Sequence, residues 1–387
     1  MQRLHMTPRP NWESTAEALG FTFHTMYGDT YWDESAAYAF SLAQIEQDLE
    51  DPATELHSLC LAAVETLVSS DAGLARMGIP EAMRDAVAAS WARRDPTLYG
   101  RFDFAYDGHG PAKLLEYNAD TPTSLYEASA FQWLWLEDQM RSGALPPGTD
   151  QFNSLHESLV AQFGHVVPSG RPMHFAACAG VTEDRQTVRY LQELAEQAGI
   201  PSHYVDIEAI GIDDRGRFSD TRGQVIERLF KLYPLEDMFR EEFAAYLPGS
   251  RTQWVEPLWK SVLSNKALLP ILWHMYPDHP NLLPAYFPDD PRAGSLRDYV
   301  TKPLFSREGA NVAVHRDGVV VDQSDGHYGA EGTILQALAP MPCFDGMTPV
   351  LGLWIVGEVC CGLGLREDRG AITRDMSRFV PHIILPD

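Results

Sequence analysis

The feature that most constrains the fold is a pair of alternating segments around a glycine-rich turn. Residues 101–106 read Arg-Phe-Asp-Phe-Ala-Tyr and residues 113–118 read Lys-Leu-Leu-Glu-Tyr-Asn, with Asp-Gly-His-Gly between them at 107–110. Glycine adopts the left-handed backbone conformations that tight turns require. Two period-2 segments that flank such a turn predict a β-hairpin.

The register of this hairpin decides which side chains share a face. If Tyr106 pairs with Pro111, Asp103 lies opposite Leu114. Side chains two positions apart along a strand project from the same face, and diagonal neighbours remain within reach of each other. Four polar side chains then project from one face: Arg101, Asp103, Glu116 and Asn118. A slip of one residue would divide them between the two faces.

Three of these side chains are suited to a metal ion. Asp103, Glu116 and Asn118 offer hard oxygen atoms, which Mg²⁺ prefers and which it often shares with substrate phosphates. Arg101 beside them can neutralise phosphoryl oxygens. The alternative is a surface hairpin whose charges only solvate it.

A helix is expected directly after the hairpin. Ser124-Leu-Tyr-Glu127 is a capping-box pattern, which marks the start of a helix. Thr121, Thr123 and Ser124 would then lie at the helix N-terminus, where anions bind readily.

Charge and composition restrict the classes of partner. The chain has 387 residues, so two or three subdomains around a substantial core are expected. The net charge of −24 argues against a nucleic-acid partner or an anionic membrane surface. An anionic substrate such as ATP would need a local cluster of Lys and Arg against this acidic background.

The cysteines and the N-terminal segment point to the cytoplasm. Five scattered cysteines do not form the pattern of a disulfide framework. The adjacent pair Cys360-Cys361 is expected to be buried as small apolar side chains. Residues 1–11 are polar, so we expect no signal peptide, and no segment has the length of apolar residues that a membrane helix needs.

Periodicity predicts helices in the first half of the chain. Residues 1–30 are expected to be irregular. Apolar residues at helical spacing predict helices at 32–50, 55–70, 80–94, 125–141 and 152–163.

The pattern changes after Pro168. A strand at 173–177, a helix at 184–198 and a strand at 203–207 predict a β-α-β unit with parallel strands, within a small α/β subdomain at about 168–250. A helix is predicted at 254–273. Short strand-like segments with Gly or Asp turns follow from 299 to 356 and predict antiparallel sheet.

Lys302 ends one of these segments and is followed by Phe-Ser-Arg-Glu-Gly-Ala at 305–310. A glycine lets backbone N–H groups approach a phosphate closely. The loop is not a Walker A sequence, and the chain has no dinucleotide-binding Gly-x-Gly-x-x-Gly. A plain hairpin turn is the alternative.

Several segments together resemble the glutathionylspermidine synthetase family of ATP-dependent acid–amine ligases, and most closely its short bacterial members. The resemblance extends from about residue 32 to residue 381. The segments that carry it are Arg-Phe-Asp-Phe at 101–104, Lys-Leu-Leu-Glu-Tyr-Asn-Ala-Asp-Thr-Pro at 113–122, Tyr-Trp-Asp-Glu-Ser at 31–35, Phe-Lys-Leu-Tyr-Pro-Leu-Glu at 230–236, Ser-Asn-Lys-Ala-Leu-Leu-Pro at 264–270, Lys-Pro-Leu-Phe-Ser-Arg-Glu-Gly-Ala-Asn at 302–311 and Cys-Gly-Leu-Gly-Leu-Arg-Glu-Asp at 361–368.

The resemblance implies a mixed α/β (α+β) chain with an ATP-grasp fold, an inserted pre-ATP-grasp α/β subdomain and a helical N-terminal region. The boundaries expected from it are 1–167 for the helical region and the metal-binding hairpin, 168–255 for the inserted subdomain and 256–387 for the nucleotide-binding region.

The resemblance also assigns roles to residues of this chain. It implies Mg²⁺ ligation by Asp103, Glu116 and Asn118, catalytic roles for Arg101 and a mobile Arg366, and a substrate site at Thr121 and Thr123. The family has serines at these two positions, so the threonines leave glutathione itself uncertain as the substrate. For Arg366, a surface salt bridge to Glu367 or Asp368 is the alternative. The nucleotide contacts that it implies are Arg101, Phe102, Asp103, Lys266, Lys302, Arg307, Gly309, Ala310, Gln336 and Ile372.

The function expected from residues and resemblance together is a ligase that uses ATP and Mg²⁺ to join a small carboxylic acid or peptide to an amine or polyamine. A carboxylate would attack the γ-phosphoryl group, and the amine would then displace phosphate from the acyl phosphate. An ATP-binding regulatory or interaction module with ATPase activity only is the first alternative. A two-metal hydrolase that uses the same carboxylates is the second.

Overall fold

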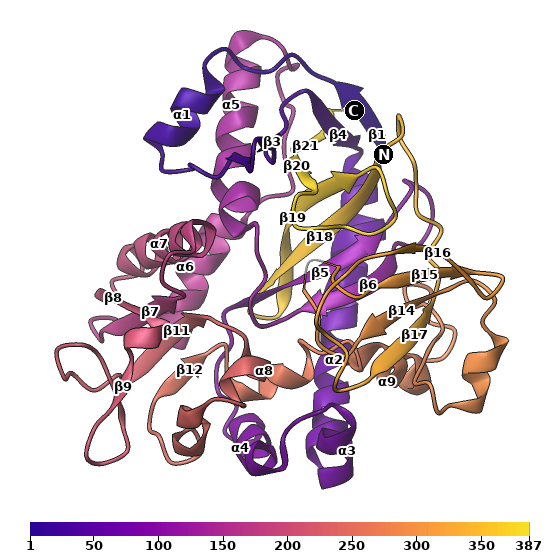
Figure 1. Cartoon of the computed structure of the whole chain (residues 1–387). Helices are drawn as coiled ribbons and strands as arrows, with labels where there is room; N and C mark the ends of the chain where they lie inside the picture. The colour runs from indigo at the N-terminus through magenta and orange to yellow at the C-terminus, as the bar shows by residue number, and fades with distance from the viewer. Residues whose placement is uncertain (308, 387) are drawn as a thin grey trace.

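The computed structural model describes residues 1–307 and 309–386. Helices and strands are interspersed up to residue 298, and the described elements from Tyr299 to Ile384 are all strands. Three of the sheets have four or five strands (Figure 1). No described helix combines the length and the apolar character needed to cross a membrane.

The central sheet is antiparallel and joins segments that lie far apart in the sequence. Its strand order is β20-β19-β18-β5-β6. The bounds are β5 (Tyr99–Ala105), β6 (Lys113–Asn118), β18 (Thr348–Val356), β19 (Val359–Asp368) and β20 (Arg378–Val380). The predicted hairpin β5–β6 is therefore confirmed, and it adds to a sheet built from the last part of the chain.

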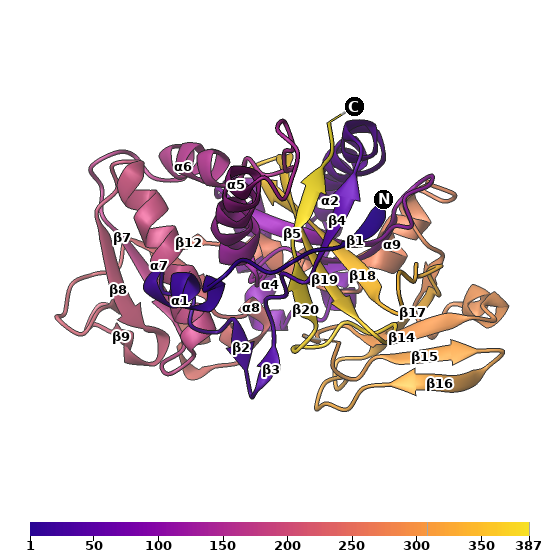
Figure 2. The same ribbon diagram turned by 90° about the horizontal axis from the view of Figure 1, so that it is seen from above.

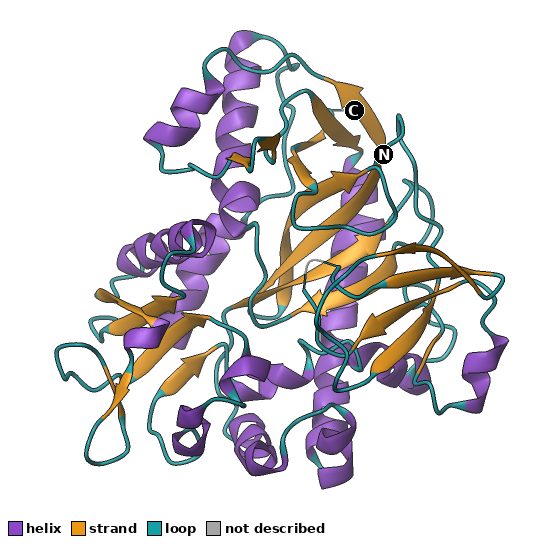
Figure 3. Ribbon diagram, viewed as in Figure 1, coloured by secondary structure: helices purple, strands orange, loops and turns teal. Residues whose placement is uncertain are grey.

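Alternate residues of β18 face two different cores. Leu351 and Leu353 pack in the core that contains helix α2 (Asp51–Val68), which runs along one face of the sheet (Figure 3). Trp354 packs in the core that contains helix α6 (Leu155–Val166) on the other face. The adjacent cysteines of β19 divide in the same way, Cys360 toward α2 and Cys361 toward α6, and both are free and buried as expected.

A second antiparallel sheet lies beside the hairpin and has the strand order β13-β17-β14-β15-β16. It is backed by helix α9 (Leu268–Met275). Its strands are β13 (Ala285–Tyr286), β14 (Tyr299–Pro303), β15 (Ala313–Arg316), β16 (Val319–Gln323) and β17 (Thr333–Ala337). The antiparallel character predicted for this part of the chain is confirmed, although residues 350–356 belong to the central sheet.

The third sheet is parallel and has the strand order β12-β11-β7-β8. Helix α7 (Thr182–Gln197) connects β7 to β8, so the predicted β-α-β unit is confirmed. The strands are β7 (Met173–Ala177), β8 (Ser202–Asp206), β11 (Arg228–Leu232) and β12 (Gln253–Val255).

The terminal strands of the described chain lie on either side of one strand, β4 (Ala36–Phe40) (Figure 2). Strand β4 pairs with β1 (Gln2–His5) and with β21 (His382–Ile384). The remaining elements are α1 (Trp12–Ala18), β2 (Thr25–Met26), β3 (Asp29–Thr30), the π-helical η1 (Gln44–Glu50), α3 (Asp71–Arg76), α4 (Glu81–Ala92), the π-helical η2 (Glu127–Phe131), α5 (Gln132–Ser142), η3 (Ile207–Ala209), β9 (Gly211–Ile212), β10 (Phe218–Ser219), α8 (Leu235–Met238), η4 (Glu242–Tyr246), η5 (Leu258–Val262) and η6 (Pro291–Ser295).

Three predictions were wrong in detail. The segment 32–50 is a strand followed by a π-helical turn, and not one helix. Residues 36–40 are buried throughout, so their sequence shows no polar face that would distinguish a strand from a helix. The segment 254–273 is a strand, a 3₁₀ turn and a short helix, with Pro257 before the turn. Residues 1–30 are not irregular, since they contain β1 and α1.

Candidate active site

The hairpin β5–β6 pairs Asp103 with Glu116 and Arg101 with Asn118. The predicted register placed Asp103 opposite Leu114 and is therefore wrong by two residues. A β-bulge after Asp103, where the ladder resumes at Phe104 and Leu114, accounts for part of the shift. Because the error is an even number of residues, all four polar side chains still project from one face.

Hydrogen bonds hold these four side chains together. Arg101 donates from Nε to Oδ1 of Asp103 at 2.6 Å and from Nη2 to Oδ2 at 2.9 Å. The Nδ2 atom of Asn118 is 3.1 Å from an oxygen of Asp103 and 3.1 Å from an oxygen of Glu116. The two carboxylates therefore face one volume, and the expected metal ligands lie together.

A glycine on the neighbouring strand makes room for Arg101. Gly352 of β18 pairs with Asp103, and a Cβ atom at position 352 would lie 2.7 Å from Cδ of Arg101. The Arg101 guanidinium is buried and also donates to the carbonyl oxygen of Thr123 at 2.7 Å. It is thus fixed at three points beside the carboxylates.

Two lysines connect the hairpin to the second sheet. Lys302 of β14 donates to the carbonyl oxygen of Leu115 and to Oε1 of Gln336, both at 2.8 Å. Lys266, which lies just before α9, is 3.0 Å from Oε2 of Glu116 and donates to the carbonyl oxygen of Ser306 at 2.8 Å. Both ammonium groups thus lie next to the Glu116 side of the hairpin.

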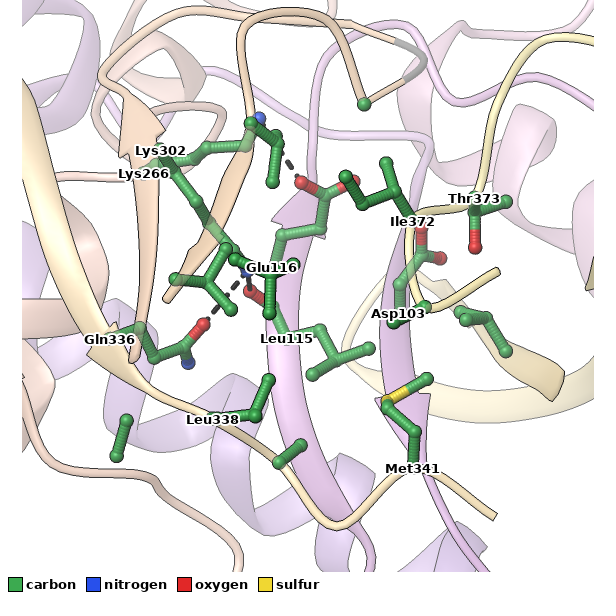
Figure 4. A pocket seen from close by; sticks show the side chains of 18 residues that line it. Asp103, Leu115, Glu116, Lys266, Lys302, Gln336, Leu338, Met341, Ile372 and Thr373 are labelled. Atoms are coloured by element: carbon green, nitrogen blue, oxygen red, sulfur yellow. Dashed lines mark hydrogen bonds and ion pairs between the residues drawn. The ribbon is translucent and has the colours of Figure 1, made fainter. Parts of the chain in front are cut away.

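A pocket opens between the hairpin and the second sheet (Figure 4). Its polar end is formed by Asp103, Glu116, Lys266 and Lys302. The rest of its wall is mainly apolar: Leu115, Val300, Val312, Val314, Ala337, Leu338, Ala339, Met341, Val350, Ala371 and Ile372. The pocket contains about 740 Å³ of space free of protein atoms, including the part open to solvent, which is within the range for small-molecule sites.

The glycine loop covers one side of this pocket. Gly309 has φ +68°, and a Cβ atom there would lie 2.5 Å from the carbonyl oxygen of Thr373. Only glycine therefore allows the loop to approach the segment 371–373 so closely. Glu308, in the same loop, lies outside the described residues.

Burial and charge act differently on the two carboxyl groups. For Asp103, burial is the stronger influence and raises the pKa despite the adjacent Arg101. Burial alone would also raise the pKa of Glu116, but the charges of Lys266 and Lys302 outweigh it and hold that pKa at about 2. Burial lowers the pKa of Lys302 to about 8. The polar end of the pocket therefore combines a carboxylate that the two lysines keep charged with a carboxyl group whose pKa is raised.

Two polar cavities adjoin the main pocket. One contains Arg307, whose guanidinium contacts Thr121 Oγ1 and donates to Oε1 of Glu236 at 2.9 Å. The other contains Arg366 together with Arg101, Asp103 and Ser124. Arg366 donates to the carbonyl oxygens of residues 374, 375 and 377.

The alternative interpretation of Arg366 as a surface salt bridge is not what the structure has. Glu367 pairs with Arg3 at 2.8 Å, and Asp368 accepts a hydrogen bond from Ser377 at 2.7 Å.

Several residues implied by the resemblance are not brought into the main pocket. The ring of Phe102 is buried in the core and stacks on Tyr117 with 3.8 Å between centroids, on the opposite face of the hairpin from Asp103. Thr123 contributes its carbonyl oxygen to Arg101. Ala310 lies beyond the wall residue Gly309, and its N–H donates to the carbonyl oxygen of Arg307.

Sequence reasoning missed part of the apolar wall and one buried cluster. Met341 lines the pocket from the segment after β17, where no motif marks it. The capping-box pattern led to a correct helix start but not to a capping box: Ser124 and Glu127 both hydrogen-bond to Tyr31. The Tyr-Trp-Asp-Glu-Ser segment at 31–35 was the available signal.

The donor set fits a magnesium ion in its chemistry. The described residues contain no cluster of three or more His, Cys, Asp or Glu side chains that could hold a metal ion. Two carboxylates and an amide nevertheless offer hard oxygens, and each carboxylate has about four lone-pair positions. Asp103 uses three in the contacts above and Glu116 uses two, so both retain capacity for a ligand.

Comparison with known proteins decides the family. The model of the family "Glutathionylspermidine synthase preATP-grasp" matches residues 3–385. This chain belongs to that family. A Haemophilus influenzae protein named "Putative acid--amine ligase" is 41% identical over 392 residues and is matched over 98% of both chains.

More distant relatives of this family member are longer. The trypanothione synthetase of Crithidia fasciculata is 29% identical, with 83% of this chain and 52% of that protein matched. The bifunctional glutathionylspermidine synthetase/amidase of Escherichia coli is 27% identical, with 88% and 58% matched. This chain thus spans little more than half the length of these two relatives.

One solved structure supports the fold. A glutathione synthetase-like effector of Globodera pallida, GSS30, superposes with a TM-score of 0.56 at 11% identity and covers 90% of this chain and 89% of its own. The two proteins therefore share a mixed α/β fold.

Proposed function

We propose that this protein is an ATP-dependent acid–amine ligase with an ATP-grasp fold. In this proposal a carboxylate substrate attacks the γ-phosphoryl group of ATP, and ADP leaves. An amine then attacks the acyl phosphate, forms the amide bond and releases phosphate. The family membership and the names of the relatives support this class of reaction.

The observation that carries the proposal is the pocket with two chemically different ends. Lys266 and Lys302 stand at the polar end beside Asp103 and Glu116, and an apolar slot that ends at Leu338 and Met341 extends away from them. A nucleotide has the same division into a charged phosphate chain and a flat base. The local lysines and arginines supply the positive charge that the acidic protein otherwise lacks.

In this proposal Asp103, Glu116 and Asn118 hold Mg²⁺. When bound, the ion supplies positive charge beside the phosphoryl oxygens. Arg101, fixed by Asp103 and by the carbonyl oxygen of Thr123, stabilises the charge that develops on the transferred phosphoryl group.

The remaining residues divide between nucleotide and substrate. Gln336 fixes Lys302, and Ile372 borders the apolar slot, while the Arg307–Ala310 loop covers the phosphates. Arg366 faces the cavity next to Asp103 and closes over the reacting groups. Thr121, held by Arg307, and Thr123 border the acid substrate, which we infer to be a small carboxylic acid or peptide.

The test is ADP release with a panel of acids and amines. Purified protein is incubated with ATP and Mg²⁺, glutathione and other thiol peptides, and spermidine and other polyamines, and products are analysed by mass spectrometry. We expect an acid and an amine together to raise ADP release above the ATP-only rate and to yield the amide. Formation of AMP and pyrophosphate would exclude the acyl-phosphate route, and ADP without any amide would favour the ATPase-only alternative.

A further inference from the structure

Three buried side chains form a chain of hydrogen bonds behind the cavity that contains Arg366. Tyr31, Ser124 and Glu127 are 2%, 4% and 0% exposed. The Tyr31 hydroxyl lies 2.8 Å from Oγ of Ser124 and 2.7 Å from Oε1 of Glu127. The residue roles proposed for the ligase reaction include none of these three groups.

The direction of the hydrogen bonds follows from the number of protons. Tyr31 has one hydroxyl proton and donates it to the Glu127 carboxylate. Ser124 must therefore donate to Tyr31, which leaves the lone pairs of its own oxygen free to accept. All donors thus point from Ser124 toward Glu127.

Ser124 is also where this chain of hydrogen bonds meets the active site. It lines the cavity shared by Arg101, Asp103 and Arg366, and it follows Thr123, whose carbonyl oxygen accepts from Arg101. Its φ of +67° is in the left-handed region, which a residue other than glycine rarely adopts. Unfavourable backbone conformations of this kind persist where the surrounding structure holds them in place, and they are frequent at active sites.

Glu127 has the properties of a proton acceptor. Its Oε2 atom is buried and has no hydrogen-bond partner among the described residues. Burial raises the pKa of Glu127, while the Tyr31 hydrogen bond and the charges of Arg366 and Arg101 act in the opposite direction. Glu183 is the further carboxyl group whose charge acts on Glu127 from helix α7.

We propose that Ser124, Tyr31 and Glu127 form a proton relay that deprotonates the amine substrate. The inference rests on the proposed ligase function. An amine that arrives as an ammonium ion loses one proton to Ser124 Oγ, which passes its own proton to Tyr31, which passes its own to Oε1 of Glu127. The free nitrogen lone pair then attacks the acyl carbon.

The remaining steps balance without any other group. As the C–N bond forms, the bond between the acyl carbon and the phosphate oxygen breaks, and phosphate leaves with that electron pair. The departing phosphate takes up the second proton of the nitrogen. After the product leaves, the proton returns from Glu127 through Tyr31 to Ser124, which lines the emptied cavity, and passes from there to solvent.

The experiment compares two nucleophiles, spermidine and hydroxylamine. Spermidine is protonated at neutral pH and needs a base, whereas hydroxylamine is largely neutral and traps an acyl phosphate directly as a hydroxamate. The acid is the one that gives the highest ADP release with spermidine in the panel above. General-base catalysis contributes about 10²–10⁴-fold, so Glu127→Gln is expected to lower spermidine ligation at least about 10²-fold and to change hydroxamate formation less than about threefold.

The variant should also show a different pH profile. Without the relay, ligation depends on the fraction of free amine, so the Glu127→Gln rate should rise about tenfold per pH unit and approach wild type in alkali. Tyr31→Phe should behave like Glu127→Gln. The matched control is Tyr38→Phe. It removes another buried hydroxyl that donates to a glutamate, Oε2 of Glu367, at 2.6 Å, and the Tyr38 side chain lines none of the three site cavities.

Three outcomes would overturn the relay. If Glu127→Gln lowers hydroxamate formation as much as spermidine ligation, or changes neither rate, the three side chains only support the fold. If wild-type protein forms neither hydroxamate nor amide, the ligase function itself is wrong and the relay falls with it. Glu127→Asp, which keeps the carboxyl group, should recover part of the spermidine rate.

Discussion

The buried ion pair between Lys231 and Asp120 connects the parallel sheet to the segment that follows the hairpin. The Nζ atom of Lys231 lies 2.6 Å from Oδ1 of Asp120, and both side chains are 0% exposed. The same ammonium group donates to the carbonyl oxygen of Tyr233, and the N–H of Leu235 donates to Oδ2 of Asp120, both at 2.8 Å. Each charge thus has its partner and a backbone group within hydrogen-bond distance, while Lys260 and Arg307 act on Asp120 through their charges alone.

Lys231→Met keeps most of the volume and leaves the Asp120 carboxylate without its cation. Loss of one partner of a buried pair typically costs about 3–5 kcal/mol. The carboxylate escapes part of this penalty by taking up a proton. An ordinary aspartate binds its proton near pH 4, and each pH unit is worth about 1.36 kcal/mol, so protonation limits the charge penalty to about 4 kcal/mol at pH 7 and about 1.5 kcal/mol at pH 5.

The assay is urea unfolding, followed by circular dichroism at both pH values. We expect Lys231→Met to lose about 3–4 kcal/mol of unfolding free energy at pH 7 and roughly 2 kcal/mol less than that at pH 5. The double variant Lys231→Met/Asp120→Asn carries no charge at these two positions, so its loss should be the same at both pH values. An equal loss for the single variant at pH 5 and pH 7, or a loss below about 1 kcal/mol at pH 7, would refute the reasoning.

Three further predictions follow from the site and the core. Asp103→Asn should lower Mg²⁺-dependent ADP formation by about 10²–10³-fold. It should also lower the melting temperature, because Arg101 loses its only carboxylate partner among the described residues. Unchanged ADP formation would show that this hairpin is not part of the active site. Gly309→Ala should raise the KM for ATP while lowering the melting temperature only slightly, since its Cβ would lie 2.5 Å from the carbonyl oxygen of Thr373 and push the loop outward. An unchanged KM would contradict this. Burial lowers the pKa of His57 and of His382 to about 3, so below pH 6.5 the unfolded chain binds protons that the folded chain does not. Each histidine should therefore remove up to about 1.36 kcal/mol of stability per pH unit as the pH falls toward 3. His382→Gln should flatten the measured dependence of unfolding free energy on pH.

The hairpin shows what a local pattern determines and what it leaves open. Alternation fixed the face of Asp103 and Glu116, because side-chain direction repeats every two residues. The register depended on the conformation of the turn and on a bulge, neither of which the alternation records. The resemblance supplied Lys266, although the helix predicted around it begins only at Leu268.

The errors arose where burial removes the pattern. Ala36–Phe40 is buried on both sides, so its apolar run fits a helix or a strand equally well. Contacts between distant segments are equally invisible to local reasoning. Tyr31 meets Glu127, 96 positions away, and a capping-box pattern suggested a different partner for that glutamate.

The pairing of β5 with β18 has a consequence for synthesis of the protein on the ribosome. Asp103 is made about 250 residues before its pairing partner Gly352, which at roughly 5–20 residues per second is a delay of about 12–50 s. During that time the inner edge of β5 has no neighbouring strand, and such an edge can pair with other chains. The parallel sheet, whose strands all lie between 173 and 255, can close within this interval. Nascent chains that stall before β18 should therefore carry a folded parallel sheet and a hairpin whose open β5 edge can pair with other chains. These stalled chains should be the species that chaperones bind.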